Sequence, residues 1–236
     1  MVKLSPTLAL RATVFIQIMK ITPVIFWDVY GTLLAAQRGD LESLLRRHAE
    51  LTEIFAVTAR QFAAPATLDR FLAIIAAQRD RRAVAHPEIR IEEVWQELLA
   101  GATLDDACAA AWDFERRANP KQPMPEAAAT LAELHRRGHR QGIISNAQFY
   151  TRRELAELLP AVFDPELIFL SCDLGVAKPA PTAFQLARAK VHPAPCLMIG
   201  DSLANDIVPS RQLGFTALHY APTGDIQRLS QVLERV

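Results

Sequence analysis

A small set of polar residues in this sequence has the types and positions needed for chemistry on an anionic substrate. Each ends a short apolar run or lies where a segment of helical spacing begins: Asp28, Ser145, Asn146, Lys178, Asp201 and Asp206. They offer a carboxylate nucleophile, a hydroxyl, backbone N–H donors, an ammonium group and a pair of acids. If one fold brings these groups together, they can bind an oxyanion and offset its charge. Any one of them alone is more typical of a turn, a helix cap or an exposed surface.

The apolar runs before these residues predict strands that are buried on both faces. Five blocks are rich in apolar, β-branched and aromatic residues: 24–27, 142–145, 167–170, 196–200 and 215–219. Segments of helical spacing lie between and after the later blocks: 126–137, 151–159, 181–190, 204–213 and 225–235. This alternation predicts an α/β fold with a parallel sheet, whose strands collect ligands at their carboxyl ends.

A different pattern follows the first strand. Residues 40–118 contain four helical patterns, at about 40–63, 67–83, 91–100 and 103–117, and no convincing strand. The proline-rich stretch 119–125 comes next, and the fixed φ angles of its prolines predict a stiff, non-helical linker. We therefore expect a core formed by residues 19–39 and 119–236, with residues 40–118 inserted as an all-helical domain.

Composition excludes several classes of protein. Half of the 236 residues are hydrophobic, and 26 basic residues balance 26 acidic ones, which is unlike an intrinsically disordered chain. Because the chain has no net positive charge, neither nucleic acid nor an anionic membrane surface is expected as a partner. The sequence leaves the oligomeric state open.

The cysteines and the N-terminal residues indicate a cytoplasmic protein. Cys108, Cys172 and Cys196 form no Cys-x-x-Cys pair, so reduced thiols are expected. The apolar stretch 8–18 is interrupted by Arg11, is followed by no cleavage pattern, and is too short to span a bilayer. We expect residues 1–18 to be an extension that the fold does not need, either poorly ordered or foreign to the native chain.

Some residues outside the polar set have a structural interpretation. Trp95 and Trp112 have apolar neighbours at helical spacing, so core packing is expected for both. Gln148 and Tyr150 follow Asn146, and the sequence leaves open whether they face a cleft between the core and the insert.

The polar residues and their flanking sequences together resemble the four motifs of the haloacid dehalogenase superfamily of hydrolases. The matching segments, in order and spacing, are VIFWDVYGTLL at 24–34, GIISN at 142–146, VAKP at 176–179 and LMIGDSLANDI at 197–207. This resemblance implies a Rossmann-like core, an aspartyl covalent intermediate, a small-molecule substrate and usually a magnesium ion. Residues 40–118 correspond by position to the cap domain of that family.

The same resemblance assigns roles around the substrate. Asp28 is the nucleophile, and Ser145 with the backbone of Asn146 binds the phosphoryl group. Lys178 neutralises charge, and Thr32 is a further substrate-binding candidate.

A metal site is also implied by the resemblance. Its ligands are Asp28, Asp201, Asp206 and the backbone carbonyl of Tyr30, and its ion is Mg²⁺. The chemistry agrees, because a carboxylate that attacks a phosphate dianion meets repulsion that a divalent cation and a lysine can offset. Two unit charges about 4 Å apart interact by roughly 4 kcal/mol at an effective dielectric constant near 20.

Tyr30 departs from the pattern of the family's phosphatases. Those enzymes carry a second aspartate two residues after the nucleophile, where it acts as general acid and base. A phenol has an ordinary pKa near 10 and is a poor base at neutral pH, although it can donate a proton or shape the pocket. Tyr30 is therefore kept as a catalytic candidate.

Three functions are compatible with these residues. We favour a magnesium-dependent phosphatase that acts on a small phosphate monoester, because Asp201 and Asp206 keep the metal-binding form. The first alternative is a 2-haloacid dehalogenase-type hydrolase, whose first motif is similar to D-x-Y-G-T-L and whose halide-binding arginine would be a residue such as Arg60. The second alternative is a pseudoenzyme that keeps the ion site but turns over weakly.

Overall fold

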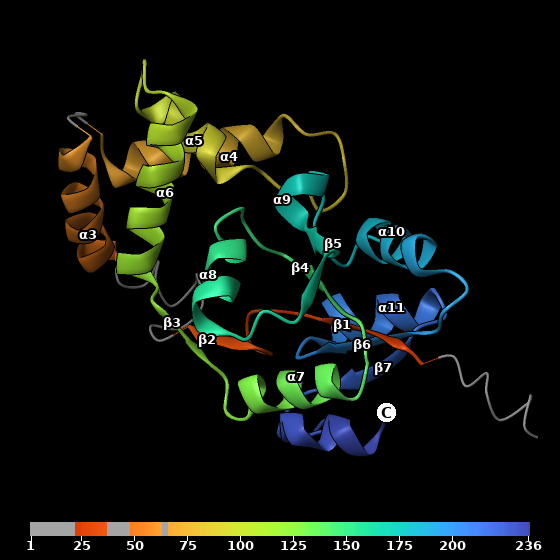
Figure 1. Cartoon of the computed structure of the whole chain (residues 1–236). Helices are drawn as coiled ribbons and strands as arrows, with labels where there is room; N and C mark the ends of the chain where they lie inside the picture. Colours follow the sequence, from red (N-terminus) through yellow and green to blue (C-terminus); the bar gives the residue numbers. More distant parts are fainter. Residues whose placement is uncertain (1–21, 37–47, 63–65) are drawn as a thin grey trace, which may run out of the picture.

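The structure is a computed structural model that describes residues 22–36, 48–62 and 66–236. Figure 1 shows an α/β part, in which helices flank a sheet, and a group of helices that stands to one side of it. The expected extension, residues 1–18, lies outside the described residues, as does the beginning of the first helix expected in the insert. None of the described helices is both long and apolar enough to cross a bilayer.

Within the described residues, five strands form a parallel sheet in the order β5-β4-β1-β6-β7. The strands are β1 (Val24–Trp27), β4 (Gln141–Ser145), β5 (Phe163–Leu170), β6 (Cys196–Gly200) and β7 (Thr216–His219). The predicted α/β fold with a parallel sheet is therefore confirmed. Because the strands are parallel, the residues that follow β1, β4 and β6 meet at one edge of the sheet.

Helices cover both faces of the sheet (Figure 1). They are α7 (Ala127–Arg136), α8 (Thr151–Leu158), α9 (Ser171–Leu174), α10 (Thr182–Val191), α11 (Val208–Gln212), the π-helical turn η1 (Leu203–Ile207) and the 3-10 helix η2 (Leu229–Glu234). Successive residues of β1 face opposite sides: Ile25 and Trp27 pack with α7, whereas Val24 and Phe26 pack with α10. Burying a side chain of this size contributes about 1.5–3 kcal/mol, so both faces stabilise the sheet.

Two of the helices expected from sequence differ in the structure. The segment expected as one helix at 204–213 is divided into η1 and α11, with Pro209 in the first turn of α11. Proline has no N–H for a helical bond to the preceding turn, and it is tolerated where a helix begins. The segment expected as a helix at 225–235 contains only η2, in which Leu229 and Val232 are buried three residues apart. That spacing suits a 3-10 helix, which has three residues per turn.

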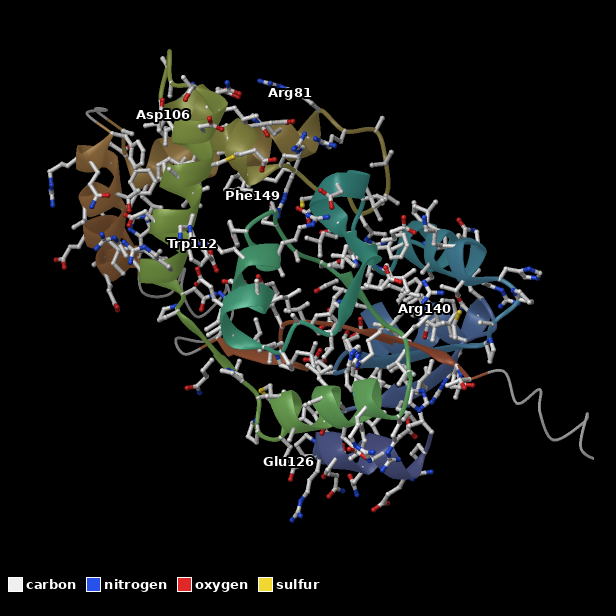
Figure 2. The ribbon with its side chains drawn as sticks, in the orientation of Figure 1. Arg81, Asp106, Trp112, Glu126, Arg140 and Phe149 are labelled. Atoms are coloured by element: carbon white, nitrogen blue, oxygen red, sulfur yellow. The ribbon has the colours of Figure 1, made fainter. Side chains whose placement is uncertain are left out.

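In the described part of the insert there are four helices, which confirm the helical patterns at 67–83, 91–100 and 103–117 and the described portion of the pattern at 40–63. The helices are α3 (His48–Gln61), α4 (Leu68–Asp80), α5 (Ile91–Leu98) and α6 (Leu104–Ala118). They enclose an apolar cluster that is separate from those beside the sheet, and Trp95 lies fully buried in it, as expected. Trp112 differs from the prediction, because it is only half-buried and lies against α8 (Figure 2). Its ring lies 4.6 Å from the guanidinium of Arg153.

The proline-rich linker is a strand in the structure. Strand β3 (Lys121–Pro123) pairs antiparallel with β2 (Leu34–Ala36), forming a two-stranded ribbon between the sheet and the insert. Pro120 precedes β3, and Pro123 is its last residue. A ribbon of two strands tolerates these prolines, which have no N–H group to donate to a further strand. The linker is therefore non-helical, as predicted, and its pairing with β2 is a feature that the sequence did not indicate.

Candidate active site

Asp28 lies directly after β1, and its backbone N–H still donates to the Ile199 carbonyl oxygen at 2.9 Å. Its side chain is 9% exposed. Oδ1 accepts hydrogen bonds from the Ser145 hydroxyl at 2.8 Å and from the Lys178 ammonium at 2.7 Å. No donor within the described part of the chain bonds to Oδ2. One carboxylate oxygen is therefore held in place, while the other has no hydrogen bond that would reduce its nucleophilicity.

Lys178 joins two of the predicted site carboxylates. Its Nζ lies 2.7 Å from Asp28 Oδ1 and 2.5 Å from Asp206 Oδ1, and it also donates to the Ile144 carbonyl oxygen at 3.0 Å. Burial alone would lower the pKa of Lys178, but Asp28 and Asp206 raise it above its ordinary value. The ammonium form of this buried lysine is therefore stabilised next to Asp28.

The side chain of Asn146 holds the backbone of Lys178. Its Nδ2 donates to the Lys178 carbonyl oxygen at 3.0 Å, and its Oδ1 accepts from the Lys178 N–H at 2.6 Å. Sequence reasoning gave a role only to the backbone of Asn146. The two loops that carry Ser145 and Lys178 are thus fixed to each other by an amide side chain, which can donate and accept at once.

Asp28, Asp201 and Asp206 form an acidic cluster. One carboxylate oxygen from each lies within 4.8 Å of the others. Burial and the charge of Asp28 raise the pKa of Asp206 to about 6, and the same two causes raise the pKa of Asp201. Carboxylates held this close repel one another, so the cluster favours a bound cation over an empty site.

Two glycines make room for the carboxylates of this cluster. A Cβ at Gly31 would overlap the carboxylate of Asp201, and a Cβ at Gly200 would overlap that of Asp206. Gly31 also has a φ of +85°, which side-chain-bearing residues rarely adopt. The backbone of both motifs is therefore shaped around the acids, which is the arrangement expected where three carboxylates converge on one point.

The Tyr30 hydroxyl is directed toward α8. It donates to Glu154 Oε2 at 2.6 Å and lies 2.7 Å from the Thr151 hydroxyl oxygen. Burial and the charge of Glu154 raise the pKa of Tyr30 well above its ordinary value. The phenol therefore stays protonated at neutral pH, and its proton is already shared with Glu154.

Glu154 belongs to a polar network that the sequence did not predict. Lys121 Nζ lies 3.9 Å from Glu154 and 2.5 Å from Glu115, and the Tyr150 hydroxyl donates to Glu115 at 3.1 Å. Charged residues are usually exposed, so no pattern in the sequence indicates that these side chains converge. The network joins α6, β3 and α8 beneath the insert.

Two further candidates have no observed contact with the nucleophile. Thr32 is fully buried, and its hydroxyl has no hydrogen-bond partner among the described residues. Arg60 is exposed in the last turn of α3. Their binding roles remain predictions.

The insert contributes a cavity of about 270 Å³ that also reaches the core. Most of its lining is apolar, including Phe71, Trp95 and Phe114, and its core residues include Gln148 and Tyr150. Gln148 accepts a hydrogen bond from the Ile91 N–H at 3.0 Å. Gln148 and Tyr150 thus lie at the boundary between the core and the insert.

The fold and the four converging motifs define the class of the protein. The haloacid dehalogenase-like hydrolase family matches residues 22–214, and the chain belongs to this family. Among curated proteins, a phosphoserine phosphatase from Thermus thermophilus is 30% identical over 131 residues. That match covers 54% of this chain and 53% of the relative, so the chain spans about half the length of the relative that it matches.

Solved structures of both kinds of hydrolase are similar to this fold. A 2-haloacid dehalogenase from Pseudomonas syringae pv. tomato has a TM-score of 0.60 and 25% identity, and the match covers 90% of this chain and 97% of that chain. A HAD phosphatase from Thermococcus onnurineus has a TM-score of 0.57 and 21% identity, with the same coverage. These likenesses agree with the Rossmann-like core.

Proposed function

We propose that the protein is a magnesium-dependent phosphatase that hydrolyses a small phosphate monoester through an aspartyl-phosphate on Asp28. The observation that carries the proposal is the cluster of Asp28, Asp201 and Asp206 beside the buried ammonium of Lys178. A neutral carbon centre that carries a halogen would not require a cluster of acids that can hold a divalent cation beside the attacking carboxylate. A phosphate dianion does.

In the first step, Asp28 Oδ2 forms a bond to phosphorus while the bond to the leaving oxygen breaks. Ser145 and Lys178, which lie 2.8 and 2.7 Å from Asp28 Oδ1, are close enough to donate to the phosphoryl oxygens at that carboxylate. Asn146 keeps Lys178 in place during this step. In the second step, water attacks phosphorus, the bond between Asp28 Oδ2 and phosphorus breaks, and inorganic phosphate leaves with the Asp28 carboxylate restored. The proton that the attacking water loses passes to solvent, and solvent supplies the proton that the leaving oxygen takes up.

The acidic cluster fits a hard divalent cation, because it supplies only carboxylate oxygens and two glycines leave room for them. Asp28, Asp201 and Asp206 would hold Mg²⁺, with the Tyr30 carbonyl as the fourth ligand that the family resemblance implies. A bound Mg²⁺ would offset the negative charge of the phosphoryl oxygens.

We propose that the helical insert acts as the cap of this site and that its cavity takes the organic part of the substrate. The cavity is lined mainly by apolar side chains and includes core residues that closely follow Ser145 and Asn146. The three cysteines are free in the structure, and we place the protein in the cytoplasm as part of this proposal.

The decisive experiment is hydrolysis of 4-nitrophenyl phosphate with Mg²⁺ and with a chelator. We expect turnover only with Mg²⁺ and loss of turnover in Asp28→Asn. Asp105→Asn, which changes an exposed aspartate of α6, is the matched control and should behave as the wild type. Equal rates with and without Mg²⁺, or full activity in Asp28→Asn, would contradict the proposal.

A dehalogenase function is the second candidate, because Tyr30 occupies the second position after the nucleophile and a 2-haloacid dehalogenase has a similar structure. It predicts release of chloride or bromide from 2-halo acids when a chelator is present. A panel of 2-halo acids that releases no halide would exclude it.

A further inference from the structure

A short segment between α4 and α5 leaves the helical insert and contacts the core loop that carries Lys178. Pro87 and Val176 form an antiparallel bridge, and backbone hydrogen bonds of 2.9 and 3.1 Å lie on either side of it. Val176 is two residues before Lys178 in the sequence. The insert is therefore hydrogen-bonded to the chain segment that presents the lysine.

The next residue of this segment, Glu88, points a carboxylate into the core. Glu88 is buried, with only 8% of the residue exposed. Oε2 accepts from the Ser171 hydroxyl at 2.7 Å, and Oε1 accepts from Gln148 Nε2 at 3.2 Å and from the Ile89 N–H at 3.0 Å. No cationic side chain among the described residues pairs with it. Burying a carboxylate is unfavourable unless several hydrogen-bond donors satisfy it. The neutral donors of Ser171, Gln148 and Ile89 do so here.

The hydrogen-bond partners of Glu88 connect it to the loop after Ser145 and Asn146, which is the second substrate-binding loop of the proposed site. Ser171 Oγ accepts a hydrogen bond from the Ala147 N–H at 2.9 Å, and Ala147 directly follows Asn146. Gln148 is the next residue, and its side chain also accepts from the first N–H of α5 at 3.0 Å. Phe149 then packs against the apolar cluster of the insert (Figure 2). One carboxylate of the insert thus contacts, through one hydroxyl and one amide, the loop that begins with Ser145.

We propose that Glu88 is a positioning residue, through which the helical insert holds both substrate-binding loops in their active arrangement. The backbone of residues 86–88 fixes the loop before Lys178, and the Glu88 carboxylate fixes the loop after Asn146. Asn146 already joins Lys178 to the Ser145 loop, so the three segments form one closed set of hydrogen bonds. Displacements of the order of 1 Å at such groups can change the catalytic rate about a hundredfold. This set of hydrogen bonds therefore determines how precisely Ser145 and Lys178 are positioned.

The proposal goes beyond the phosphatase function, although its kinetic test rests on that function. The variants are Glu88→Ala, Glu88→Gln and Ser171→Ala, and the matched control is Glu93→Gln on the exposed face of α5. We expect Glu88→Ala to raise the inhibition constant of inorganic phosphate and to lower kcat/KM, each by about tenfold. Glu88→Gln keeps one carbonyl acceptor and should recover part of the loss. Glu93→Gln should change neither value.

A double-variant cycle distinguishes positioning from general loss of stability. Ser171→Ala should reproduce much of the effect of Glu88→Ala, and the two changes together should cost little more than either alone, because they break the same connection. Additive effects, or an unchanged inhibition constant in a folded Glu88→Ala protein, would overturn the proposal.

Hydrogen–deuterium exchange tests the same connection without any activity. The N–H groups of Ala147 and Ala177 are bonded in the connection, and we expect both to exchange about tenfold faster in Glu88→Ala than in Glu93→Gln. Unchanged exchange would refute the proposal even if the protein is a phosphatase, whereas faster exchange would support it even if no phosphate ester is hydrolysed. If Glu88→Ala does not fold, Ser171→Ala decides by the same measurements.

Discussion

Asp28 has one carboxylate oxygen fixed by Ser145 and Lys178, and this asymmetry has a chemical consequence. A carboxylate that is bonded on one side rotates little, so the unbonded oxygen stays aimed in one direction. The cation that restrains it is also shared with Asp206. Asp28, Lys178 and Asp206 therefore form one electrostatic unit, and a change to any of them alters the other two.

Replacing Lys178 with Met tests this unit. The variant leaves Asp28 and Asp206 buried with no ammonium between them, and one of the two acids can take up a proton to limit the repulsion. We expect a loss of about 3 kcal/mol in the free energy of unfolding measured by urea with a chelator, and a smaller loss with Mg²⁺. Activity should be lost in both buffers.

Lys190→Met is the control, because Lys190 is exposed at the end of α10. It should match the wild type within about 0.5 kcal/mol. A Lys178→Met protein that is as stable as the wild type without Mg²⁺ would show that the lysine does not hold the two acids together.

In the proposed phosphatase reaction, Tyr30 limits which leaving groups the site can expel. Its phenol is protonated and already donates to Glu154, so it gives the departing oxygen little help. We expect kcat for aryl phosphates, whose leaving groups need no proton, to exceed kcat for alkyl phosphates by about a hundredfold or more. A series of substituted phenyl and alkyl phosphates measures this dependence.

Two variants make the test sharper. Tyr30→Phe removes the phenol hydroxyl while keeping the ring, and its kcat should depend on the leaving group as that of the wild type does. Tyr30→Asp supplies a carboxyl group and should narrow the difference between aryl and alkyl substrates. Alkyl phosphates that react as fast as aryl ones in the wild type would contradict this account of Tyr30.

The sequence predicted the site residues only where their positions relative to the expected strands and helices indicated them. Asp28 and Ser145 lie at the ends of β1 and β4, Lys178 lies in the loop before α10, and Asp206 lies in η1 after β6. Their hydrogen bonds confirm that they converge. Glu88 could not be found in the same way, because its partner Ser171 is 83 residues away and neither residue lies in a recognisable pattern.

At the scale of elements, strands were predicted better than the segments between them. The apolar block of β1 is fixed by burial on both faces, and its predicted ends agree with the structure. The ribbon strand β3 was expected only as a stiff, non-helical linker, because its pairing with β2 depends on a contact between segments on either side of the insert. A pattern within β3 itself could not reveal that partner.

The contact between α8 and the ribbon provides a pH-sensitive element. Burial raises the pKa of Glu154 to about 6, although Tyr30 and Lys121 act in the opposite direction. Because the folded pKa lies above the unfolded one, the proton binds the folded state more tightly. The associated stability is present below the unfolded pKa and is lost as the pH rises through about 6.

We therefore expect Glu154 to make the free energy of unfolding fall by about 2 kcal/mol between roughly pH 4 and pH 7. Urea denaturation of the wild type and of Glu154→Gln across this range measures the effect. The difference between the two proteins should change with pH, since Gln does not titrate. A constant difference would mean that Glu154 is not the titrating group, and Glu157→Gln on the same helix is the exposed control.

At the scale of the whole molecule, the apolar clusters divide the protein. Phe55, Trp95 and their neighbours form a cluster inside the insert, whereas Phe184 belongs to a cluster beside the sheet. The described connections between the two parts include many polar contacts, in the ribbon, the network around Lys121 and the contacts of Glu88, beside the aromatic contacts of Phe149 and Trp112. Polar connections of this kind can break and re-form more easily than a shared apolar core.

This division predicts that the insert can lose its structure while the sheet keeps its own. Phe55→Ala and Phe184→Ala are a matched pair, because the two side chains are 1% and 0% exposed in separate clusters. Each should lose about 3–5 kcal/mol locally. Hydrogen–deuterium exchange should show Phe55→Ala increasing exchange in α3 to α6 while β1 and β4 remain protected, and Phe184→Ala increasing exchange in the sheet. If both variants raised exchange equally everywhere, the two parts would be a single cooperative unit, and the insert could not open over the site while the catalytic edge of the sheet stays assembled.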